Sequence, residues 1–283
     1  MGIRLENVCY TYGSDTTSEI KALNNVNLEI NKGEFVAIIG HTGSGKSTLI
    51  QHFNGLERPK SGNVFYNDEN IYENNYDLRK LRCKVGLVFQ YPEHQLFEET
   101  VLKDVCFGPM NMGMSREEAE KKAKLMLEQV GINEKCYNKS PFELSGGQKR
   151  RVAIAGVLAM NPEIIVLDEP TAGLDPKGRD KILNRIKELH DNTGIGVVLV
   201  SHSMEDVANY AQRLIVINNG KIKYDGMPKD VFKHYKELEK MGLKAPQITY
   251  IMHKLKELDV DENVITIEEA RENIMQCLNR KDI

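Results

Sequence analysis

The chain has no tryptophan, and only 5 of its 283 residues are cysteine. The cysteines show no paired spacing, which disfavours a disulfide framework and a zinc motif and indicates reduced thiols. No apolar run approaches the roughly twenty residues of a membrane-spanning helix, and the amino terminus lacks an apolar signal region. The net charge of -3 indicates neither a nucleic-acid-binding field nor an acidic tail. We therefore expect a soluble, cytoplasmic protein with one large domain and an appendage, or two modest domains.

A glycine-rich stretch with the spacing of a phosphate-binding loop occupies residues 40–48. Residues 34–39 form an apolar, β-branched run that predicts a buried strand, and residues 47–53 have helical spacing. In this order, the backbone N–H groups of the loop and the positive end of the helix dipole can hold a phosphate chain. Lys46 is expected to reach the outer phosphates, and the Ser47 hydroxyl to bind a bridging Mg²⁺. We interpret the stretch as a nucleotide site.

Strands and helices alternate along most of the chain, which predicts a mostly parallel sheet with helices on both faces. Helical patterns dominate residues 98–160, so we expect a helical subdomain inserted into the sheet domain. A hairpin turn is predicted at residues 218–220, and beyond Pro228 the chain is helical and rich in charge. The predicted strands span residues 3–9, 26–30, 34–39, 63–66, 84–89, 164–167, 196–200, 214–217 and 221–224, and the clearest further helices span residues 115–130 and 177–190.

Three predicted strands end in polar side chains, and ligands of parallel sheets bind beyond the carboxyl ends of the strands. One strand ends in Asp168, expected to hold Mg²⁺ directly or through a water, and Glu169, expected to polarise the attacking water. A second delivers His202 towards a γ-phosphate, and a third delivers Gln90 as a ligand for Mg²⁺ or for the lytic water. A solvated acidic turn and an exposed histidine are the plainer alternatives. The phosphate-binding loop upstream favours the functional interpretation.

A second glycine pattern, Leu144-Ser-Gly-Gly-Gln148, opens an apolar helix. Adjacent glycines at a helix N-terminus make another anion site that the helix dipole supports. This pattern lies within the helical part, far along the chain from Lys46, and has no catalytic residue of its own. We infer that another copy of the chain completes the phosphate cage.

The order and spacing of these motifs, together with Ala172-Gly-Leu-Asp175, resemble the ATP-binding-cassette ATPases over roughly residues 1–228. The resemblance implies a P-loop NTPase fold in which two cassettes pair head to tail around two ATP molecules. Each site then takes its phosphate loop from one chain and the serine and second glycine of the Leu-Ser-Gly-Gly-Gln pattern from the other. Asp175 would communicate across the dimer, and Tyr12 would stack on adenine, with Tyr10 as a competitor for that role.

The site residues follow from the motifs and the resemblance together. The nucleotide-binding residues are Tyr12, Gly40, His41, Thr42, Gly43, Ser44, Gly45, Lys46, Ser47, Thr48, Ser145, Gly146, Gly147, Gln148 and Asp175. The catalytic residues are Lys46, Gln90, Glu169 and His202, and the Mg²⁺ ligands are Ser47, Gln90 and Asp168.

Two further stretches, Gln90-Tyr-Pro-Glu-His-Gln-Leu-Phe97 and Glu99-Thr-Val-Leu-Lys-Asp-Val, resemble the energy-coupling-factor subgroup of these ATPases. That subgroup serves vitamin and transition-metal uptake, including cobalt uptake, and carries a helical extension, here residues 229–283, that adds to the dimer. The resemblance implies an ATP-hydrolysing subunit on the cytoplasmic face of the membrane. Its partners would be a second, identical or related ATPase subunit, a transmembrane coupling subunit and a substrate-binding membrane subunit, with no nucleic acid. The membrane subunit would select the substrate.

Two other classes of cassette protein fit the sequence less well. Cassette ATPases of DNA repair and chromosome structure insert a very long coiled coil between the two glycine patterns, and no sustained heptads occur there. Translation-associated members resemble two fused cassettes, and this chain has one set of motifs. An ATPase of a membrane transporter is therefore the favoured class.

Residues 91–107 follow Gln90 directly and lead into the helical part, so they would move with both. We predict that this segment forms a groove for an amphipathic helix of the membrane partner, with acidic residues holding a basic group at one end. The alternative is that its apolar residues are core and its glutamates are solvated. The apolar members are Leu96, Phe97 and Val101, and the acidic ones are Glu93, Glu98 and Glu99.

Overall fold

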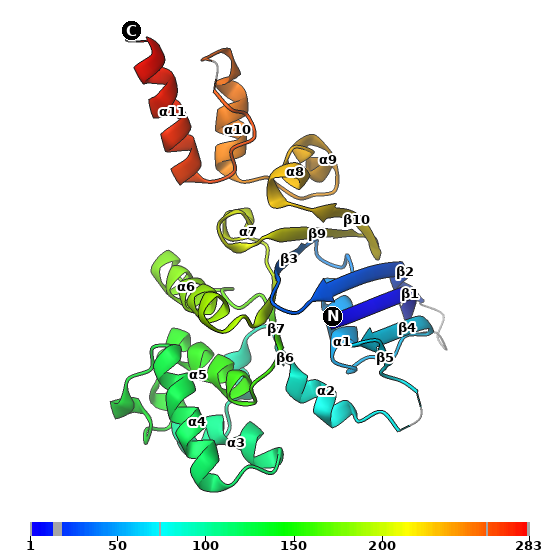
Figure 1. Ribbon diagram of the computed structural model, residues 1–283, viewed down its shortest axis with the longest axis vertical. Helices are drawn as coiled ribbons and strands as arrows, with labels where there is room; N and C mark the ends of the chain where they lie inside the picture. Colours follow the sequence, from blue (N-terminus) through cyan, green and yellow to red (C-terminus); the bar gives the residue numbers. More distant parts are fainter. Residues whose placement is uncertain (1, 14–18, 74, 259, 282–283) are drawn as a thin grey trace.

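A six-stranded, mostly parallel sheet lies at the centre of the computed structural model, which describes residues 2–13, 19–73, 75–258 and 260–281 (Figure 1). Its strands run in the order β10-β9-β3-β8-β7-β6, and β10 alone among them pairs antiparallel. Their bounds are β3 (Phe35–Ile39), β6 (Val85–Val88), β7 (Ile164–Asp168), β8 (Gly196–Val200), β9 (Arg213–Asn218) and β10 (Lys221–Gly226). All residues of β3, β6, β7 and β8 are buried, which explains their continuous apolar runs.

A second, antiparallel sheet packs over one face of the central sheet, in the order β2-β1-β4-β5. It consists of β1 (Gly2–Tyr12), β2 (Ile20–Asn31), β4 (Ser61–Tyr66) and β5 (Glu69–Asn70). Helix α1 (Lys46–Phe53) shares one hydrophobic core with both sheets. The expected mostly parallel sheet with helices on both faces is confirmed, but the predicted strands at residues 3–9, 26–30 and 63–66 form this separate sheet and do not join the central one. Local patterns predict strands, but they do not say which sheet a strand joins.

The opposite face of the central sheet packs on a helical core that includes α3, α4, α5 and α6. Their bounds are α3 (Val101–Asn111), α4 (Arg116–Gln129), α5 (Gly146–Ala159) and α6 (Pro176–Thr193). The short helices η2 (Glu134–Cys136) and η3 (Pro141–Glu143) lie between α4 and α5, whereas α2 (Leu78–Lys84) precedes β6 and η1 (Pro92–Gln95) follows it. Ser115 caps α4 in a reciprocal capping box with Glu118, at the start of the helix that the sequence predicts over residues 115–130.

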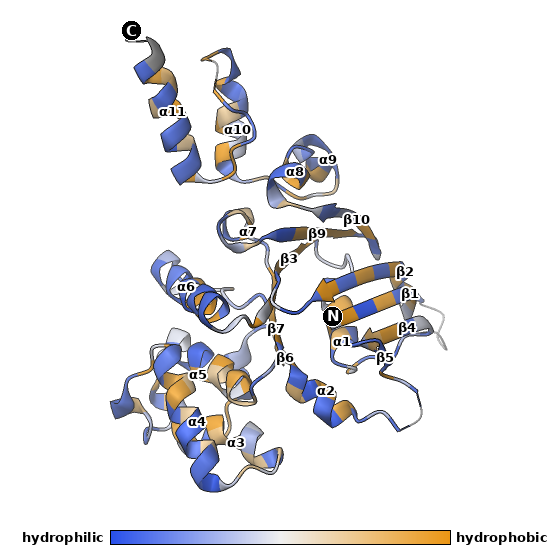
Figure 2. Cartoon of the chain, viewed as in Figure 1, coloured by the Kyte–Doolittle hydropathy of each residue, from blue (hydrophilic) through white to orange (hydrophobic). Residues whose placement is uncertain are grey.

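The carboxyl-terminal helices extend from the β9 side of the central sheet (Figure 1). They are α7 (Met204–Tyr210), α8 (Pro228–Phe232), α9 (Tyr235–Lys240), α10 (Gln247–Lys254), η4 (Lys256–Leu258) and α11 (Ile267–Lys281). Helices α7, α8 and α9 pack with β3 and β9 in one hydrophobic core. Helices α10 and α11 meet in a small cluster around Met252, Val264 and Ala270. Figure 2 shows apolar and polar residues alternating along α11, whose Ile267, Met275 and Leu278 are exposed.

The predicted hairpin turn is confirmed between β9 and β10, with Asn219 and Gly220 both at positive φ. Its position matters for the phosphate-binding loop. The Gly220 N–H donates to the Ser44 carbonyl at 2.9 Å, and the Gly220 carbonyl accepts from the Asn24 N–H at 2.8 Å. A Cβ at Gly220 would lie 2.7 Å from the Ala22 carbonyl oxygen, so the turn needs glycine both for its conformation and for this close approach.

Four of the cysteines fit the expectation of isolated thiols. Cys106 and Cys136 are buried, and Cys9 and Cys83 are half-buried, all with free thiols. Over the described ranges, no helix combines the length and the apolar character needed to cross a membrane.

Candidate nucleotide and catalytic site

The phosphate-binding loop follows β3 and leads into α1, as the sequence predicts. Its glycines are required by the backbone. A Cβ at Gly40 would lie 2.5 Å from the Ile217 carbonyl oxygen, and Gly45 has a φ of +106° with its Cβ position 2.4 Å from the Ala22 carbonyl oxygen. The buried hydroxyl of Ser44 has no hydrogen-bond partner among the described residues. A loop held this tightly, with a spare buried polar group, fits a bound phosphate chain.

Lys46 lies inside the loop with 6% of its surface exposed. Its Nζ donates to the carbonyl oxygens of Gly40 at 2.7 Å and His41 at 3.1 Å. Burial lowers the pKa of Lys46, whereas the charges of Glu169 and Asp168 act in the opposite direction. The ammonium group therefore sits between the loop and the two carboxylates, where it can attract a phosphate.

Ser47 and Asp168 form a pair of oxygen donors beside this lysine. The Ser47 hydroxyl donates to Asp168 Oδ2 at 3.2 Å. Burial raises the pKa of Asp168, the hydrogen bond from Ser47 opposes this shift, and the charge of Glu169 adds to it. A hydroxyl and a carboxylate at the same point are ligands that Mg²⁺ accepts, so these two residues can hold the ion.

Glu169 lies between the two other predicted strand-end residues. Its Oε1 is 2.7 Å from Nε2 of His202, and its Oε2 accepts a hydrogen bond from Nε2 of Gln90 at 3.2 Å. The backbone of Glu169 has a φ of +49°, and its N–H donates to the Val200 carbonyl at 3.0 Å. A non-glycine residue in this conformation needs support from its surroundings. The parallel register of the strands thus brings Gln90, Glu169 and His202 together.

The two candidate tyrosines of β1 differ in their surroundings. Tyr10 is 9% exposed, and its hydroxyl donates to Glu57 at 2.5 Å; this hydrogen bond and burial raise the pKa of Tyr10 to about 12. Tyr12 is 41% exposed and shares a 3.0 Å hydrogen bond with the Thr48 hydroxyl at the end of the phosphate loop. The edge of one ring meets the face of the other at 4.9 Å between centroids. Tyr12 is therefore the tyrosine with ring surface open beside the loop.

The second glycine pattern lies at the N-terminus of α5, in the helical part and apart from α1 (Figure 1). Ser145 and Gln148 form a reciprocal capping box, in which the Ser145 N–H donates to Gln148 Oε1 at 3.0 Å. Ser145 and Gly146 are exposed. Asp175 caps α6 by accepting a hydrogen bond from the Gly178 N–H at 3.2 Å. Within one chain the fold thus gathers the strand-end residues and leaves this glycine pattern facing solvent.

Comparison with known proteins agrees with this geometry. The family model described as "ABC transporter" matches residues 23–172. The chain is 55% identical to the energy-coupling factor transporter ATP-binding protein EcfA2 of Clostridium tetani over 99% of both chains. It is 53% identical to the EcfA2 protein of Clostridium perfringens, with full coverage of both. The chain belongs to the ATP-binding-cassette ATPase family.

Two solved cassette structures support the same assignment. CbiO1 of Clostridium perfringens, described as part of the ABC transporter complex cbiONQ, matches with a TM-score of 0.75 and 39% identity over 89% of this chain and 98% of that one. The cassette MJ0796, in a dimeric post-hydrolysis state bound to ADP and Pi, matches with a TM-score of 0.72 and 38% identity over 80% of this chain and 98% of that one. The predicted α/β cassette fold and the energy-coupling-factor resemblance are confirmed.

Arg150 is a residue of this cassette that the sequence analysis missed. It is 2% exposed and donates from Nε and NH2 to both carboxylate oxygens of Glu93, at 3.0 and 2.6 Å. The basic run that follows Gln148 contains Arg150, but nothing local distinguishes it from a solvated arginine. Removing one partner of such a buried pair typically costs about 3–5 kcal/mol.

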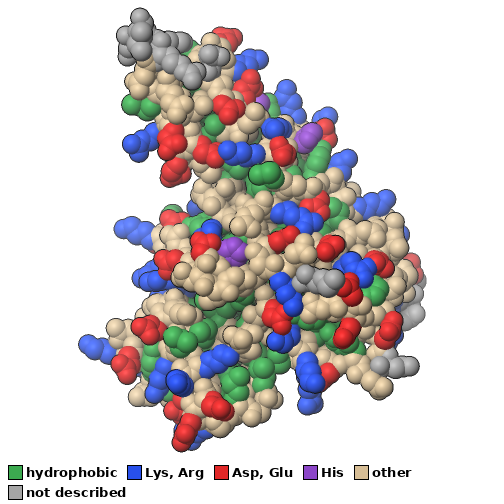
Figure 3. Space-filling view, in the orientation of Figure 1, with side chains coloured by type: hydrophobic (Ala, Val, Ile, Leu, Met, Phe, Trp, Pro, Cys, Tyr) green, Lys and Arg blue, Asp and Glu red, His purple; other side chains and the backbone are tan. Residues whose placement is uncertain are grey.

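The prediction that residues 91–107 form a docking groove is therefore wrong in part. Glu93 is bonded to a buried arginine and is not a free acidic group. Val101 at the start of α3 is fully buried and Leu96 after η1 nearly so, and both lie in the core of the helical part. Phe97 is 58% exposed and packs on Phe107 at 4.8 Å between ring centroids, as part of a surface groove of about 650 Å³. Figure 3 shows hydrophobic side chains gathered over the lower, helical part of the cassette.

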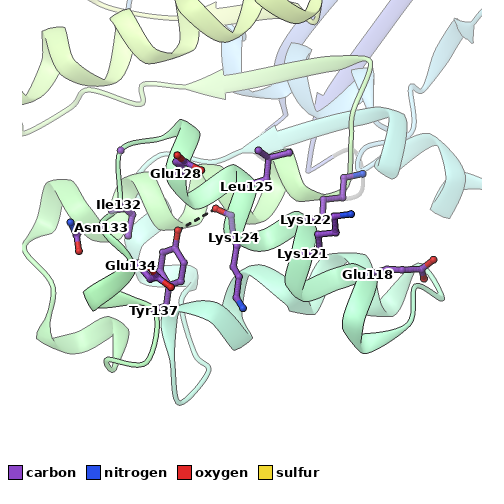
Figure 4. A pocket seen from close by; sticks show the side chains of 11 residues that line it. Glu118, Lys121, Lys122, Lys124, Leu125, Glu128, Ile132, Asn133, Glu134 and Tyr137 are labelled. Carbon is purple, nitrogen blue, oxygen red and sulfur yellow. Dashed lines mark hydrogen bonds between the residues drawn. The ribbon is translucent and has the colours of Figure 1, made fainter.

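Another cavity, of about 990 Å³, lies along α4 and far from the nucleotide motifs (Figure 4). The Tyr137 hydroxyl donates to the Lys124 carbonyl at its wall. Both lysines and glutamates line it, for example Lys121 and Glu118, so the lining favours neither an anionic nor a cationic ligand. Although this cavity is large, none of the predicted nucleotide-binding or catalytic residues lines it, so it is not the catalytic site.

Replacing Tyr12 with alanine should weaken ATP binding by about 1–3 kcal/mol, the usual contribution of one base stacked on an aromatic ring. Binding of tripolyphosphate, which has no base, should change little. Titration calorimetry with both ligands measures the difference. Tyr10→Leu is the matched control, because it removes the ring of the other candidate and leaves Tyr12 in place. An equal or larger loss of ATP affinity in Tyr10→Leu, with tripolyphosphate binding unchanged, would contradict the assignment of Tyr12.

Proposed function

We propose that the chain is the ATP-hydrolysing subunit of an energy-coupling-factor importer, bound peripherally to the cytoplasmic face of the membrane. The observation that carries this proposal is the position of Glu169, held between Gln90 and His202 beside Lys46 and the Ser47–Asp168 pair. Carboxylate, amide and imidazole around one point can orient a water and accept its proton. Residues 1–228 form the ATPase domain in this proposal, with a helical subdomain at about residues 98–160.

Each residue has a separate role in the proposed reaction. Lys46 and the N–H groups of the loop bind the phosphates, and Ser47 and Asp168 hold Mg²⁺, with Gln90 as a further ligand. Bound Mg²⁺ would neutralise charge on the phosphates. Glu169 accepts the proton of the attacking water, and His202 keeps that carboxylate oriented while contacting the γ-phosphate.

The proposed working unit is a head-to-tail dimer with an identical or related chain. The exposed N-terminus of α5 supports it, because Ser145 and Gly147 can complete the phosphate cage of the partner. Asp175 lies at the start of α6 and communicates between the two sites. ATP binding closes the dimer and hydrolysis reopens it. Residues 229–283 add to the contact, and the exposed side chains of α11 are suited to that purpose.

The membrane partners in this proposal are a transmembrane coupling subunit and a substrate-binding subunit. An amphipathic helix of the former docks in the groove beside Phe97, whose ionisable lining includes Arg79, Arg82 and Asp104. The groove begins soon after Gln90 in the sequence, so docking and catalysis are linked. The proposed cargo is cobalt, another transition-metal ion or a vitamin.

Replacing Glu169 with glutamine should lower ATP turnover by about 10²- to 10⁴-fold, the usual contribution of a general base, and leave ATP binding intact. The variant should accumulate as an ATP-bound dimer, because the cage no longer opens by hydrolysis. Phosphate release and size-exclusion chromatography with ATP measure both effects. Glu188→Gln removes an exposed carboxylate on α6 and serves as the control. Rapid turnover by Glu169→Gln would remove Glu169 from this role.

Two inactive variants should rescue each other if the cage is shared between chains. Mixing Lys46→Ala with Ser145→Arg leaves one composite site intact and gathers both changes in the other. We expect ATPase activity to return on mixing and to increase with the heterodimer fraction. No activity, even in heterodimers trapped with ATP, would contradict the head-to-tail arrangement.

Phe97→Asp should abolish docking of the membrane subunit, because it puts a charge into the apolar wall of the groove. Co-purification and substrate uptake should be lost, while the isolated protein keeps its ATPase activity. Leu125→Asp is the matched control, since Leu125 is also half-exposed but lies on α4 outside this groove. If Phe97→Asp assembles and supports uptake normally, the docking surface lies elsewhere.

A further inference from the structure

One buried guanidinium group joins three separate segments of the cassette. Arg150, on α5, uses Nε and NH2 for Glu93, and its NH1 donates to the carbonyl oxygens of Pro170 at 3.2 Å and Ala172 at 2.6 Å. These segments are the turn after Gln90, the helix that the second glycine pattern opens, and the loop after Glu169. The planar fork of arginine suits this simultaneous binding in fixed directions.

The bonds to Pro170 and Ala172 act directly beside the strained residue of the site. Glu169 has a φ of +49°, a conformation that persists only when its neighbours are fixed. On its N-terminal side, the Glu169 N–H is bonded to the Val200 carbonyl. On its C-terminal side, the first carbonyl that follows belongs to Pro170 and is held by Arg150. Arg150 and β8 therefore fix the backbone of Glu169 from both sides.

The opposite end of Arg150 is held by the turn that follows Gln90. Glu93 lies in η1, is largely buried and binds the guanidinium with both carboxylate oxygens. Burial alone would raise the pKa of Glu93, but the hydrogen bonds from Arg150 outweigh it and leave this pKa lowered. The ring of Tyr91 lies 6.0 Å from the same guanidinium. Glu93 thus stays charged and fixes the direction in which Arg150 points.

We propose that Arg150 is a positioning residue for Glu169 and that Glu93 orients Arg150 for this purpose. The helix that follows the second glycine pattern, and the turn beside the docking groove, are then connected to the carboxylate that activates water. This inference rests on the proposed role of Glu169. It adds that Arg150 affects turnover through Glu169 and not through nucleotide binding.

Two variants test the proposal without deleting the side chains. Arg150→Lys keeps the positive charge but lacks the planar fork, and Glu93→Gln keeps the shape of the carboxylate but lacks its charge. Because Glu93→Gln leaves Arg150 in place, it provides the test of the proposal if Arg150→Lys folds poorly. Arg151→Lys, at the next position of α5, is the matched control, because among the described residues no hydrogen bond or ion pair joins Arg151 to the loop after Glu169. Single-turnover ATP hydrolysis, ATP affinity and thermal unfolding are measured for each.

Arg150→Lys and Glu93→Gln should lower the hydrolysis rate by about 10- to 100-fold, since a small misplacement of a catalytic group can cost about 10²-fold. ATP affinity should remain within about twofold, and Arg151→Lys should behave as the parent in both assays. Combined with Glu169→Gln, each change should lower the residual rate by less than about twofold, because a residue that acts through Glu169 has no further effect once the carboxylate is gone.

Full multiplication of the defects in the Glu169→Gln background would overturn the proposal, because Arg150 would then act independently of Glu169. So would an unchanged rate in Arg150→Lys, or a loss of ATP affinity that matches the loss of rate. Failure of the proposed function is separate: it appears as normal turnover in the Glu169→Gln single variant.

Discussion

The parallel alignment of β3, β6, β7 and β8 is the constraint on which the rest of the cassette depends. Four segments far apart in the sequence leave the same edge of the sheet, so the phosphate loop, Gln90, Asp168–Glu169 and His202 meet there. The meeting brings a buried ammonium group next to two carboxylates. Burial of either charge alone would be costly, and their proximity offsets part of that cost. A shift in strand register would separate the charges and uncover both.

The edge of the sheet is held rigid by backbone contacts that lie outside the motifs. The hairpin turn at Gly220 donates to the Ser44 carbonyl and so supports the phosphate loop from behind. On the other side, Val200 and Arg150 hold the two ends of the strained peptide at Glu169. Because the strained backbone of Glu169 is held on both sides, its side chain keeps one orientation, and a fixed orientation favours efficient proton transfer.

The surfaces suited to partners are helical and contrast with this rigid edge. The N-terminus of α5 is exposed, the groove beside Phe97 lies between α2, α3 and α5, and α11 carries exposed apolar residues at the carboxyl end. Helices packed on a sheet through side chains can shift as units, whereas hydrogen-bonded strands cannot slide without losing their ladder. Chemistry on the sheet and contacts on the helices are therefore a consistent division of the fold.

The sequence by itself determined the motifs, the cassette family and the main strands, because glycine spacing, apolar runs and strand-end polar residues are local patterns. It also gave the residues around Glu169, since parallel strands bring their ends to one edge. Three features were decided by tertiary structure alone: the separate antiparallel sheet, the inward direction of Leu96 and Val101, and the buried bonds of Arg150 to Glu93. Each depends on which distant segment covers a given side chain. A local sequence pattern carries no information about such distant contacts. From the sequence alone, Glu93 could therefore be either a solvated charge or the partner of a buried arginine.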